Sequence, residues 1–490
     1  MKYSWFILSM YLCLVVSCNR PVTNPVYVAR YPSIYPDYVG VTIPCRIAPL
    51  NFISTDTVDL IDVVLQGKDS RIHIQEDQVV DIPIKKWKKM LANTAGDSIM
   101  VTVCIRKGKG WRHYLPFPIY VSRDTLDYGL VYRLIAPGYE VYSKMGIYQR
   151  ELDNFDQTPI MENTLVRTSC LNCHAFRHNN PDCLSFHVRG AHGATVIQQH
   201  GEGSERFMNT KVDSTLSSCV YPYWHPGGRY IAYSNNLTNQ AFHSARNERI
   251  EVVDKASDVV VYDTKKNKLL LCPRLMTDAF ETFPAFSADG KKLYFCSAEK
   301  KDIPAQYKEI KYSLCSIDFD AQDGTFGNKV DTLISTRDIG GKSISFDRPS
   351  FDGKYIMFTL SDYGNFSIWH READLYILDL RTGKYRPLTE VNSKETESFH
   401  DWSSNSHWFV FSSRRDDGLY TRLYISSIDK DGKATKPFML PQKDPISNEY
   451  SFFSYNVPEF VIAPVHVSTR NLNIGLMSKE REQFGMKKVE

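Results

Sequence analysis

The second half of the chain repeats one pattern of apolar and polar positions four times. Each copy has an aromatic residue or Pro, then a turn rich in Ser, Asp and Gly, then a strand with alternating apolar positions. The turns centre on Gly228, Gly290, Gly353 and Ser406, which are 62, 63 and 53 residues apart. Asp-Gly and Gly-Gly pairs supply the positive φ that a tight hairpin needs. The pattern therefore predicts a repeated β-hairpin.

A further strand and turn follow in three of these copies, at residues 258–263, 374–379 and 422–429. Four short antiparallel strands in a period of about 40–60 residues are typical of one β-propeller blade. Residues 194–210 would give the outer half of another blade and residues 451–461 its inner half, which closes the ring and removes exposed edges. We expect five or six blades over residues 194–465.

The first half also alternates with period two, in shorter runs separated by turn signals. One short helix is predicted over residues 84–91, where apolar residues recur every three to four positions. The other predicted elements are strands, at residues 41–43, 58–65, 71–75, 98–105 and 114–121. Several short strands at this spacing favour a sandwich. We expect a small immunoglobulin-like β-sandwich over residues 35–150.

Composition supports a folded, β-rich protein. The chain has 490 residues, of which 42% are apolar and 23% charged, and it carries 29 Tyr, 26 Phe and 7 Trp. These fractions exclude a disordered or collagen-like chain, and the aromatic content favours strands. The formal net charge is only +3. We therefore expect no nucleic-acid partner.

The N-terminus has the pattern of an export signal. Residues 3–16 form an apolar run after the single charge of Lys2, and the run is too short to span a bilayer. Residues 15–18, Val-Val-Ser-Cys, resemble the lipobox of bacterial lipoproteins, in which the chain is cleaved before a Cys that is then acylated. This resemblance implies a signal peptide at residues 1–17, an acylated Cys18 and a tether at 18–34. An ordinary signal peptide with a chance Cys is the alternative.

A C-x-x-C-H motif occurs at Cys170, Cys173 and His174. This motif is typical of covalent haem c attachment, in which two thiols bind the vinyl groups and the His is the proximal iron ligand. A redox disulfide or half a zinc site would need only the C-x-x-C. The His and the export signal favour one haem c. We expect residues 151–193 to be the haem attachment segment.

The distal ligand of such a haem is less determined. His178 is too near the proximal ligand in sequence. His187 is our candidate, because its Phe-His-x-Arg-Gly context resembles a stretch of Bacteroidota TolB-like lipoproteins that carry a haem c motif. The alternatives are His192, His200, Met208, a propeller His or no protein ligand.

A second histidine set lies in the predicted propeller. Equivalent turns of successive blades point toward one face or the central channel, so these residues could converge on a metal. They are His225, His243, His370 and His400. Four separate structural histidines are the alternative.

The repeated turn resembles the repeats of TolB-type β-propellers over residues ~185–460. Residues 47–52, 132–139, 146–150 and 454–460 also resemble Bacteroidota TolB-like lipoproteins that carry a haem c motif. The resemblance implies a fold, an anchor and a haem. It supplies no biochemical role.

Together these observations predict a mainly β lipoprotein with a β-sandwich, a haem segment, a propeller and a polar tail at residues 466–490. We expect it in the cell envelope, anchored through Cys18 and facing the periplasm from the outer membrane. The expected function is that of a c-type cytochrome for electron transfer, or for redox or gas sensing, whose propeller docks a periplasmic or membrane protein. The sequence favours a non-enzyme. The alternatives are an oxidoreductase with a His-bound metal in the channel, or a scaffold with structural haem.

Overall fold

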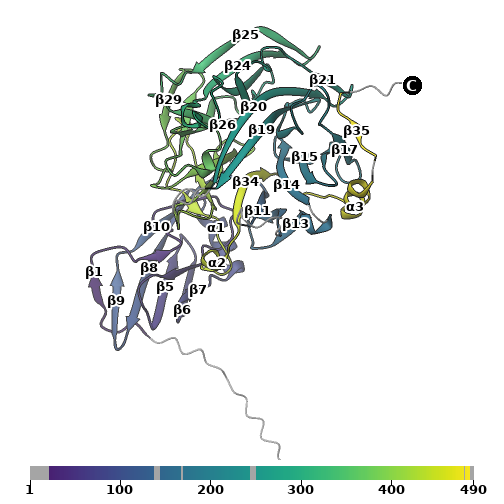
Figure 1. Cartoon of the computed structure of the whole chain (residues 1–490). Helices are drawn as coiled ribbons and strands as arrows, with labels where there is room; N and C mark the ends of the chain where they lie inside the picture. The colour runs from purple at the N-terminus through teal and green to yellow at the C-terminus, as the bar shows by residue number, and fades with distance from the viewer. Residues whose placement is uncertain (1–20, 137–143, 167–168, 243–249, 479, 486–490) are drawn as a thin grey trace, which may run out of the picture.

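The computed structural model describes residues 21–136, 144–166, 169–242, 250–478 and 480–485. It confirms that the protein is mainly β: a ring of sheets joins a smaller β domain at the N-terminal end (Figure 1). The predicted signal peptide and Cys18 lie outside the described residues. No helix in the described ranges is long and apolar enough to span a membrane.

The smaller domain contains two sheets and one helix. The three-stranded sheet has the order β2 (Ile34–Tyr35), β4 (Phe52–Ser54), β7 (Val79–Val80). The seven-stranded sheet contains β1 (Val26–Val28), β3 (Thr42–Ile43), β5 (Leu60–Gln66), β6 (Arg71–Glu76), β8 (Asp97–Lys107), β9 (Gly110–Tyr114) and β10 (Phe117–Val121). The predicted helix is confirmed as α1 (Ile84–Thr94), whose Trp87 is buried and donates from Nε1 to Ile47 O at 3.0 Å.

The ring consists of antiparallel sheets that each begin with an innermost strand. Two of them form part of one continuous sheet through a single bridge between Ser257 and Phe280. From the innermost strand outward the groups are β14 (Ser169–Arg177), β15 (Asn180–Gly190), β16 (Ala194–Gln198), β17 (Arg206–Asn209); β18 (Val220–Trp224), β19 (Tyr230–Phe242), β20 (Ile250–Asp263), β21 (Lys268–Leu270); β22 (Phe280–Phe286), β23 (Lys292–Ala298), β24 (Ser313–Asp320), β25 (Thr325–Ile334); β26 (Ser343–Pro349), β27 (Tyr355–Ser361), β28 (Asp374–Asp379), β29 (Lys384–Pro387); and β30 (Glu397–Trp402), β31 (Trp408–Ser413), β32 (Arg422–Ser427), β33 (Phe438–Met439).

The last sheet closes the ring with strands from both halves of the chain. Its order is β34 (Ser454–Val461), β11 (Gly129–Ile135), β12 (Gly146–Glu151), β13 (Gln157–Glu162), and Figure 1 shows β34 beside β11. The innermost strands contact one another in the order β14, β18, β22, β26, β30, β34 and back to β14. This arrangement is that of a β-propeller. Strands β11 and β12 fall within the segment expected to form the β-sandwich. They belong to the ring instead, because β11 pairs with β34 and β12 pairs with β11.

The turns predicted from the repeat have the expected geometry. Gly228, Gly290 and Gly353 have φ of +75°, +72° and +72°, and Ser406 has φ of +59°. Each of these residues donates its backbone N–H to the carbonyl three positions earlier, as Gly228 does to His225 O at 2.8 Å. Each turn joins an innermost strand to the next strand outward.

Every innermost strand also bulges at one equivalent position. The ladder to the next strand shifts register there, and the bulged residue is a non-glycine residue with positive φ. These residues are Cys173 (+45°), Tyr221 (+48°), Phe283 (+49°), Phe346 (+55°), Phe399 (+49°) and Val457 (+49°). A bulge re-aims side chains, and six equivalent bulges aim one set of residues alike.

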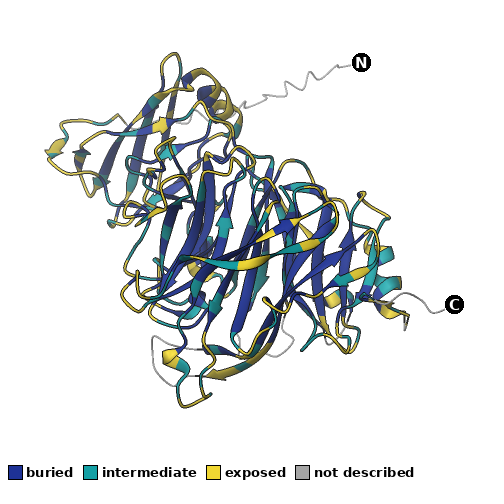
Figure 2. Ribbon diagram, turned by 90° about the horizontal axis from the view of Figure 1, so that it is seen from above, coloured by how far each residue is buried: buried dark blue, intermediate teal, exposed yellow. Residues whose placement is uncertain are grey.

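Burial is concentrated in the strands of the ring (Figure 2). The two parts of the molecule share one core, since Trp408 and Ile425 of the ring pack in the same cluster as Trp87 and Ile61 of the smaller domain. The C-terminal segment, expected as a polar tail, contains α3 (Thr469–Met477) and β35 (Glu482–Gln483), which pairs with β17. The remaining short helices are α2 (Ser447–Tyr450), η1 (Asn163–Leu165), η2 (Tyr307–Glu309) and η3 (Ser367–Trp369).

Candidate functional site

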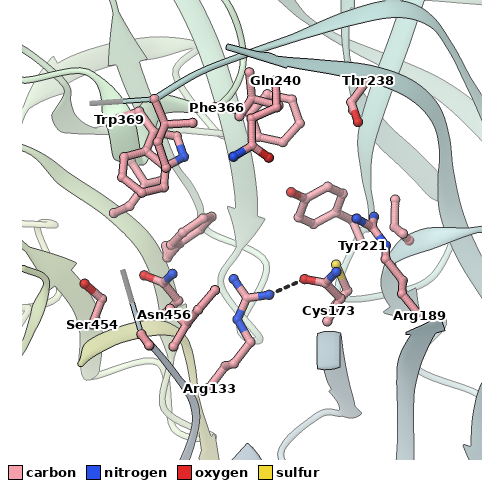
Figure 3. Close-up of a pocket in the computed structure, with 18 of the residues that line it drawn as sticks. Arg133, Cys173, Arg189, Tyr221, Thr238, Gln240, Phe366, Trp369, Ser454 and Asn456 are labelled. Carbon is pink, nitrogen blue, oxygen red and sulfur yellow. Dashed lines mark hydrogen bonds between the residues drawn. The ribbon is translucent and has the colours of Figure 1, made fainter. Parts of the chain in front are cut away.

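A cavity of about 490 Å³ lies within the ring, bounded by several of its innermost strands. Strands β14, β18, β30 and β34 contribute lining residues near the axis, and the long strands β19 and β20 contribute a wall. Figure 3 shows the labelled side chains of this cavity, with Gln240 and Thr238 on one side and Arg133 and Cys173 on the other. The cavity is larger than a single water site requires and has the size of a small-molecule pocket.

Arg133 provides a positive charge at the wall of the cavity. It lies on β11, where its Nη1 donates to Asn172 Oδ1 and, at 3.2 Å, to Leu171 O (Figure 3). Its Nε is buried and has no hydrogen-bond partner in the described part of the chain. Both bonds go to uncharged acceptors of β14, so they position the guanidinium without neutralising it.

Arg189 of β15 is exposed and adds a second positive charge on the same side of the cavity. Its side chain lies near Tyr221 and Cys173 in Figure 3. Neither Arg189 nor Arg133 forms an ion pair with any carboxylate that the structure describes. A third arginine, Arg414, is 5% exposed and stacks with its guanidinium carbon 4.5 Å from the centre of the Trp369 ring.

Aromatic and aliphatic side chains form most of the remaining lining. Tyr221, Phe242, Phe366, Trp369 and Phe399 supply rings, and amide side chains supply polar groups between them. Among the lining residues that the structure describes, no carboxylate or imidazole occurs. The cavity is therefore apolar over much of its surface and positive at one side.

Cys173 contributes a small side chain to this lining. It is 7% exposed, and burial raises the pKa of its thiol above the usual value even though Arg189 acts in the opposite direction. The thiol is therefore protonated at neutral pH. Cys170, three residues earlier, is half-buried and does not line the cavity.

The prediction of a covalently attached haem c is wrong. No group of three or more His, Cys, Asp and Glu side chains within the described ranges is arranged to hold a metal ion. The motif itself lies on strand β14, where Cys173 lines the cavity and the following residue, His174, does not. A proximal iron ligand would have to lie over the plane of the haem that the two thiols attach.

His174 instead packs between neighbouring sheets. Its ring is buried and lies near the backbone of Val131 and Val457, and burial lowers its pKa to about 3, with a further lowering by Arg133. Cys173 and His174 of the motif thus lie in the bulge of an innermost strand. The electron-transfer role depended on this haem and loses its basis.

His187, the predicted distal ligand, lies on β15 away from the cavity lining. It is buried, its Nδ1 is 3.0 Å from Thr195 Oγ1, and burial lowers its pKa to about 3. Of the alternatives, Met208 is fully buried in β17, and His200 is exposed.

The structure does not bring the second histidine set together. His225 Nε2 lies 3.1 Å from Gly290 O, and His400 Nε2 lies 2.9 Å from Met357 O. Burial lowers the pKa of His370, but hydrogen bonds to Glu251 and Glu372 outweigh it and raise that pKa to about 9. His243 lies outside the described residues. The described members have separate structural partners.

Sequence reasoning missed Arg133 and Arg189. Arg133 stands in an otherwise apolar strand segment, Leu-Val-Tyr-Arg-Leu-Ile (130–135), whereas Arg189 is an exposed residue near the end of β15. An Arg within a buried strand pattern is a signal for a binding or ion-pair site. The pattern could not show that the sheets of the two arginines are neighbours, because these sheets meet where β34 closes the ring.

No family model matches the chain, and no curated protein does. Among solved structures, an oligogalacturonate lyase in complex with manganese aligns with a TM-score of 0.35 at 11% identity, over 62% of this chain and 72% of that chain. Kuenenia stuttgartiensis hydrazine synthase aligns at 0.41 and 13% identity, over 66% and 48%. A Mycobacterium tuberculosis puromycin-hydrolyzing peptidase aligns at 0.34 and 11% identity, over 71% and 52%. At these scores the fold assignment rests on the sheet order alone.

Proposed function

We propose that the protein is a binding protein whose ring cavity holds an organic anion with a flat, apolar body. Carboxylate is the anionic group that suits the site best, because a guanidinium matches it with two parallel N–H donors. The aromatic rings of Tyr221, Phe366 and Trp369 provide surfaces for the apolar body.

The observation that carries this proposal is the half-buried, uncompensated charge of Arg133, to which the exposed Arg189 adds a second positive charge at the cavity wall. A charged group at a partly dry site is costly unless an opposite charge pairs with it. Arg133 is half-buried beside neutral acceptors, and no carboxylate of the described residues forms an ion pair with it. A bound anion would supply the missing partner.

The lining supports binding rather than catalysis. General acid–base catalysis needs a group that exchanges protons near neutral pH, and nucleophilic catalysis needs an activated nucleophile. The described lining offers arginines, amides, hydroxyls and a protonated Cys173 thiol. These groups hold and orient a ligand.

We also propose that the ring is a six-bladed, TolB-like propeller and that the chain is an exported lipoprotein anchored at Cys18. The circular order of contacts among β14, β18, β22, β26, β30 and β34 supports six blades. The lipobox-like residues 15–18 support the anchor. The cavity would then face an envelope compartment, where small organic acids can reach it.

The experiment is a calorimetric titration of the purified protein with 1-naphthoate and with 1-naphthamide, which share the same ring system. We expect the acid to bind at least about tenfold more tightly than the amide, because charged hydrogen bonds contribute about 1.5–3 kcal/mol. Raising the salt concentration should weaken the binding of the acid only. Equal affinity for the two ligands, or no binding of either, would overturn the proposal.

A further inference from the structure

Four of the innermost strands carry an aromatic ring at the bulged position, and these rings form a continuous arc around the channel. The ring centres of Tyr221 and Phe283 are 4.6 Å apart, those of Phe283 and Phe346 are 5.6 Å apart, and those of Phe346 and Phe399 are 5.0 Å apart. The rings meet edge to face, which is a favourable packing for aromatic pairs.

The arc is interrupted on the two remaining strands, which are neighbours at the closure of the ring. Val457 of β34 and Cys173 of β14 hold the equivalent positions, with φ of +49° and +45°. Neither side chain is aromatic. The cavity reaches the two ends of the arc, Tyr221 and Phe399, and it extends to Cys173 between them.

Both uncompensated arginines lie at this interruption. Arg133 pairs in register with Asn456, the residue before Val457, and it donates to Leu171 and Asn172 of β14. Arg189 pairs in register with Cys170 on the same sheet as Cys173. The space that a ring at position 173 would fill is therefore space beside the cationic wall.

We infer that Cys173 is a specificity-determining residue that sets the size of the anion the cavity accepts. This inference rests on the proposed function. A small side chain at position 173 leaves room for a two-ring body next to Arg133, and a fifth aromatic ring there would extend the arc and close that room.

The backbone at this position is suited to an aromatic residue. Positive φ is unusual for bulky side chains. Nevertheless Tyr221, Phe283 and Phe346 adopt nearly the same φ as Cys173 at equivalent bulges. A Cys173→Phe substitution therefore adds a side chain that this local geometry accepts in neighbouring sheets.

The test compares Cys173→Phe with the control Cys45→Ser, at a half-buried cysteine of the smaller domain outside the cavity lining, using benzoate, 1-naphthoate and 1-pyrenecarboxylate as probes. We expect Cys173→Phe to weaken the binding of 1-naphthoate at least about tenfold and that of benzoate by less than about threefold. The reason is that one lost ring contact and a clash cost about 1–3 kcal/mol. The affinity of Cys45→Ser should stay within about twofold of the wild type for all three probes. Uniform weakening of every probe by Cys173→Phe, or no change, would overturn the inference.

Thermal unfolding without ligand provides an independent measurement. We expect Cys173→Phe to unfold within a few degrees of the wild type, because the added ring packs at the end of an existing arc. A misfolded variant, or one whose Tm falls by more than about 10 °C, would overturn the inference, since overpacking costs typically about 1–3 kcal/mol. Failure of the wild type to bind any probe would instead overturn the proposed function.

Discussion

His174 and His400 occupy equivalent positions in two sheets of the ring. Each follows the bulged residue of an innermost strand, Cys173 in one case and Phe399 in the other. His400 Nε2 lies 2.9 Å from the carbonyl oxygen of Met357 on the second strand of the preceding sheet, and His174 lies near the backbone of Val131 on the equivalent strand. Both residues therefore pack between neighbouring sheets.

We predict that these two histidines make the fold sensitive to acid. Burial lowers the pKa of each to about 3, whereas the unfolded chain has the usual value of 6.5. Between these values the unfolded state binds more protons, so stability falls as pH falls below 6.5, by up to about 1.4 kcal/mol per pH unit for each histidine. Urea unfolding from pH 4 to 7 measures this slope.

His400→Gln should give a shallower slope than the wild type, because one titrating group is removed. The exposed His200 provides the matched control, and His200→Gln should leave the slope unchanged. An unchanged slope in His400→Gln would contradict the structural role.

A pair of buried carboxyl groups should make the folding stability depend on pH in the opposite direction. Asp401 and Glu459 line a small cavity with Arg348, and each accepts a backbone N–H across a sheet boundary, from Phe460 and Phe176. Burial raises the pKa of Asp401 to about 7, and burial together with Asp401 raises that of Glu459 well above its usual value. The folded state therefore binds more protons, and stability falls as pH rises from about 4 through 7.

Glu459→Gln should relieve this loss, because the amide keeps an acceptor for the Phe176 N–H but does not ionise. We expect its stability relative to the wild type to increase by up to about 1.4 kcal/mol per pH unit between pH 5 and 7. Glu76→Gln, at an exposed residue that ends strand β6, serves as control with no such trend. Parallel pH profiles for Glu459→Gln and the wild type would refute the assignment.

Two turn glycines should differ in their tolerance of a side chain. Gly290 and Gly353 have the same φ of +72°, which costs an alanine about 1–2 kcal/mol. A Cβ at Gly290 would also overlap the imidazole of His225, whereas one at Gly353 would meet only Ala288, at 3.5 Å. Gly290→Ala should therefore destabilise the protein more than Gly353→Ala by at least about 1 kcal/mol in chemical unfolding. Equal losses would contradict the packing at His225.

The proposed anchor gives a prediction about location. Cys18→Ser should leave the protein soluble or unprocessed, because the acylated thiol is lost and stable membrane binding needs more than one acyl chain. Membrane fractionation measures the result, and Cys13→Ser, within the signal, should fractionate as the wild type does. Full membrane retention of a normally matured Cys18→Ser protein would contradict the anchor.

The repeat in the sequence was sufficient to predict the ring, because local turn residues such as Gly228 and Gly353 indicate each hairpin. The closing sheet could not be predicted in the same way. Its pairing of β11 with β34 joins residues more than 300 positions apart, and no local pattern encodes such a partner.

The motif at Cys170–His174 shows why a site is harder to predict than a fold. Its spacing is typical of haem attachment. The same residues are also compatible with the bulge of an innermost strand followed by a histidine between two sheets, as at Phe399 and His400. Alignment of the bulges, with Phe176 matching Trp402, would have suggested this alternative. The Arg133 and Arg189 pair depends on which sheets are neighbours, which the sequence pattern does not show.

The most direct test of the central claim is a double-mutant cycle between Arg133 and the ligand carboxylate. The four dissociation constants are those of the wild type and Arg133→Gln, each for 1-naphthoate and 1-naphthamide, with Arg337→Gln as an exposed arginine control. We predict that Arg133→Gln weakens binding of the acid at least about tenfold and binding of the amide by less than about threefold, so that the two changes are coupled by about 0.7 kcal/mol or more. Equal weakening of both ligands, or an effect of Arg337→Gln as large as that of Arg133→Gln, would contradict an anion site in the ring.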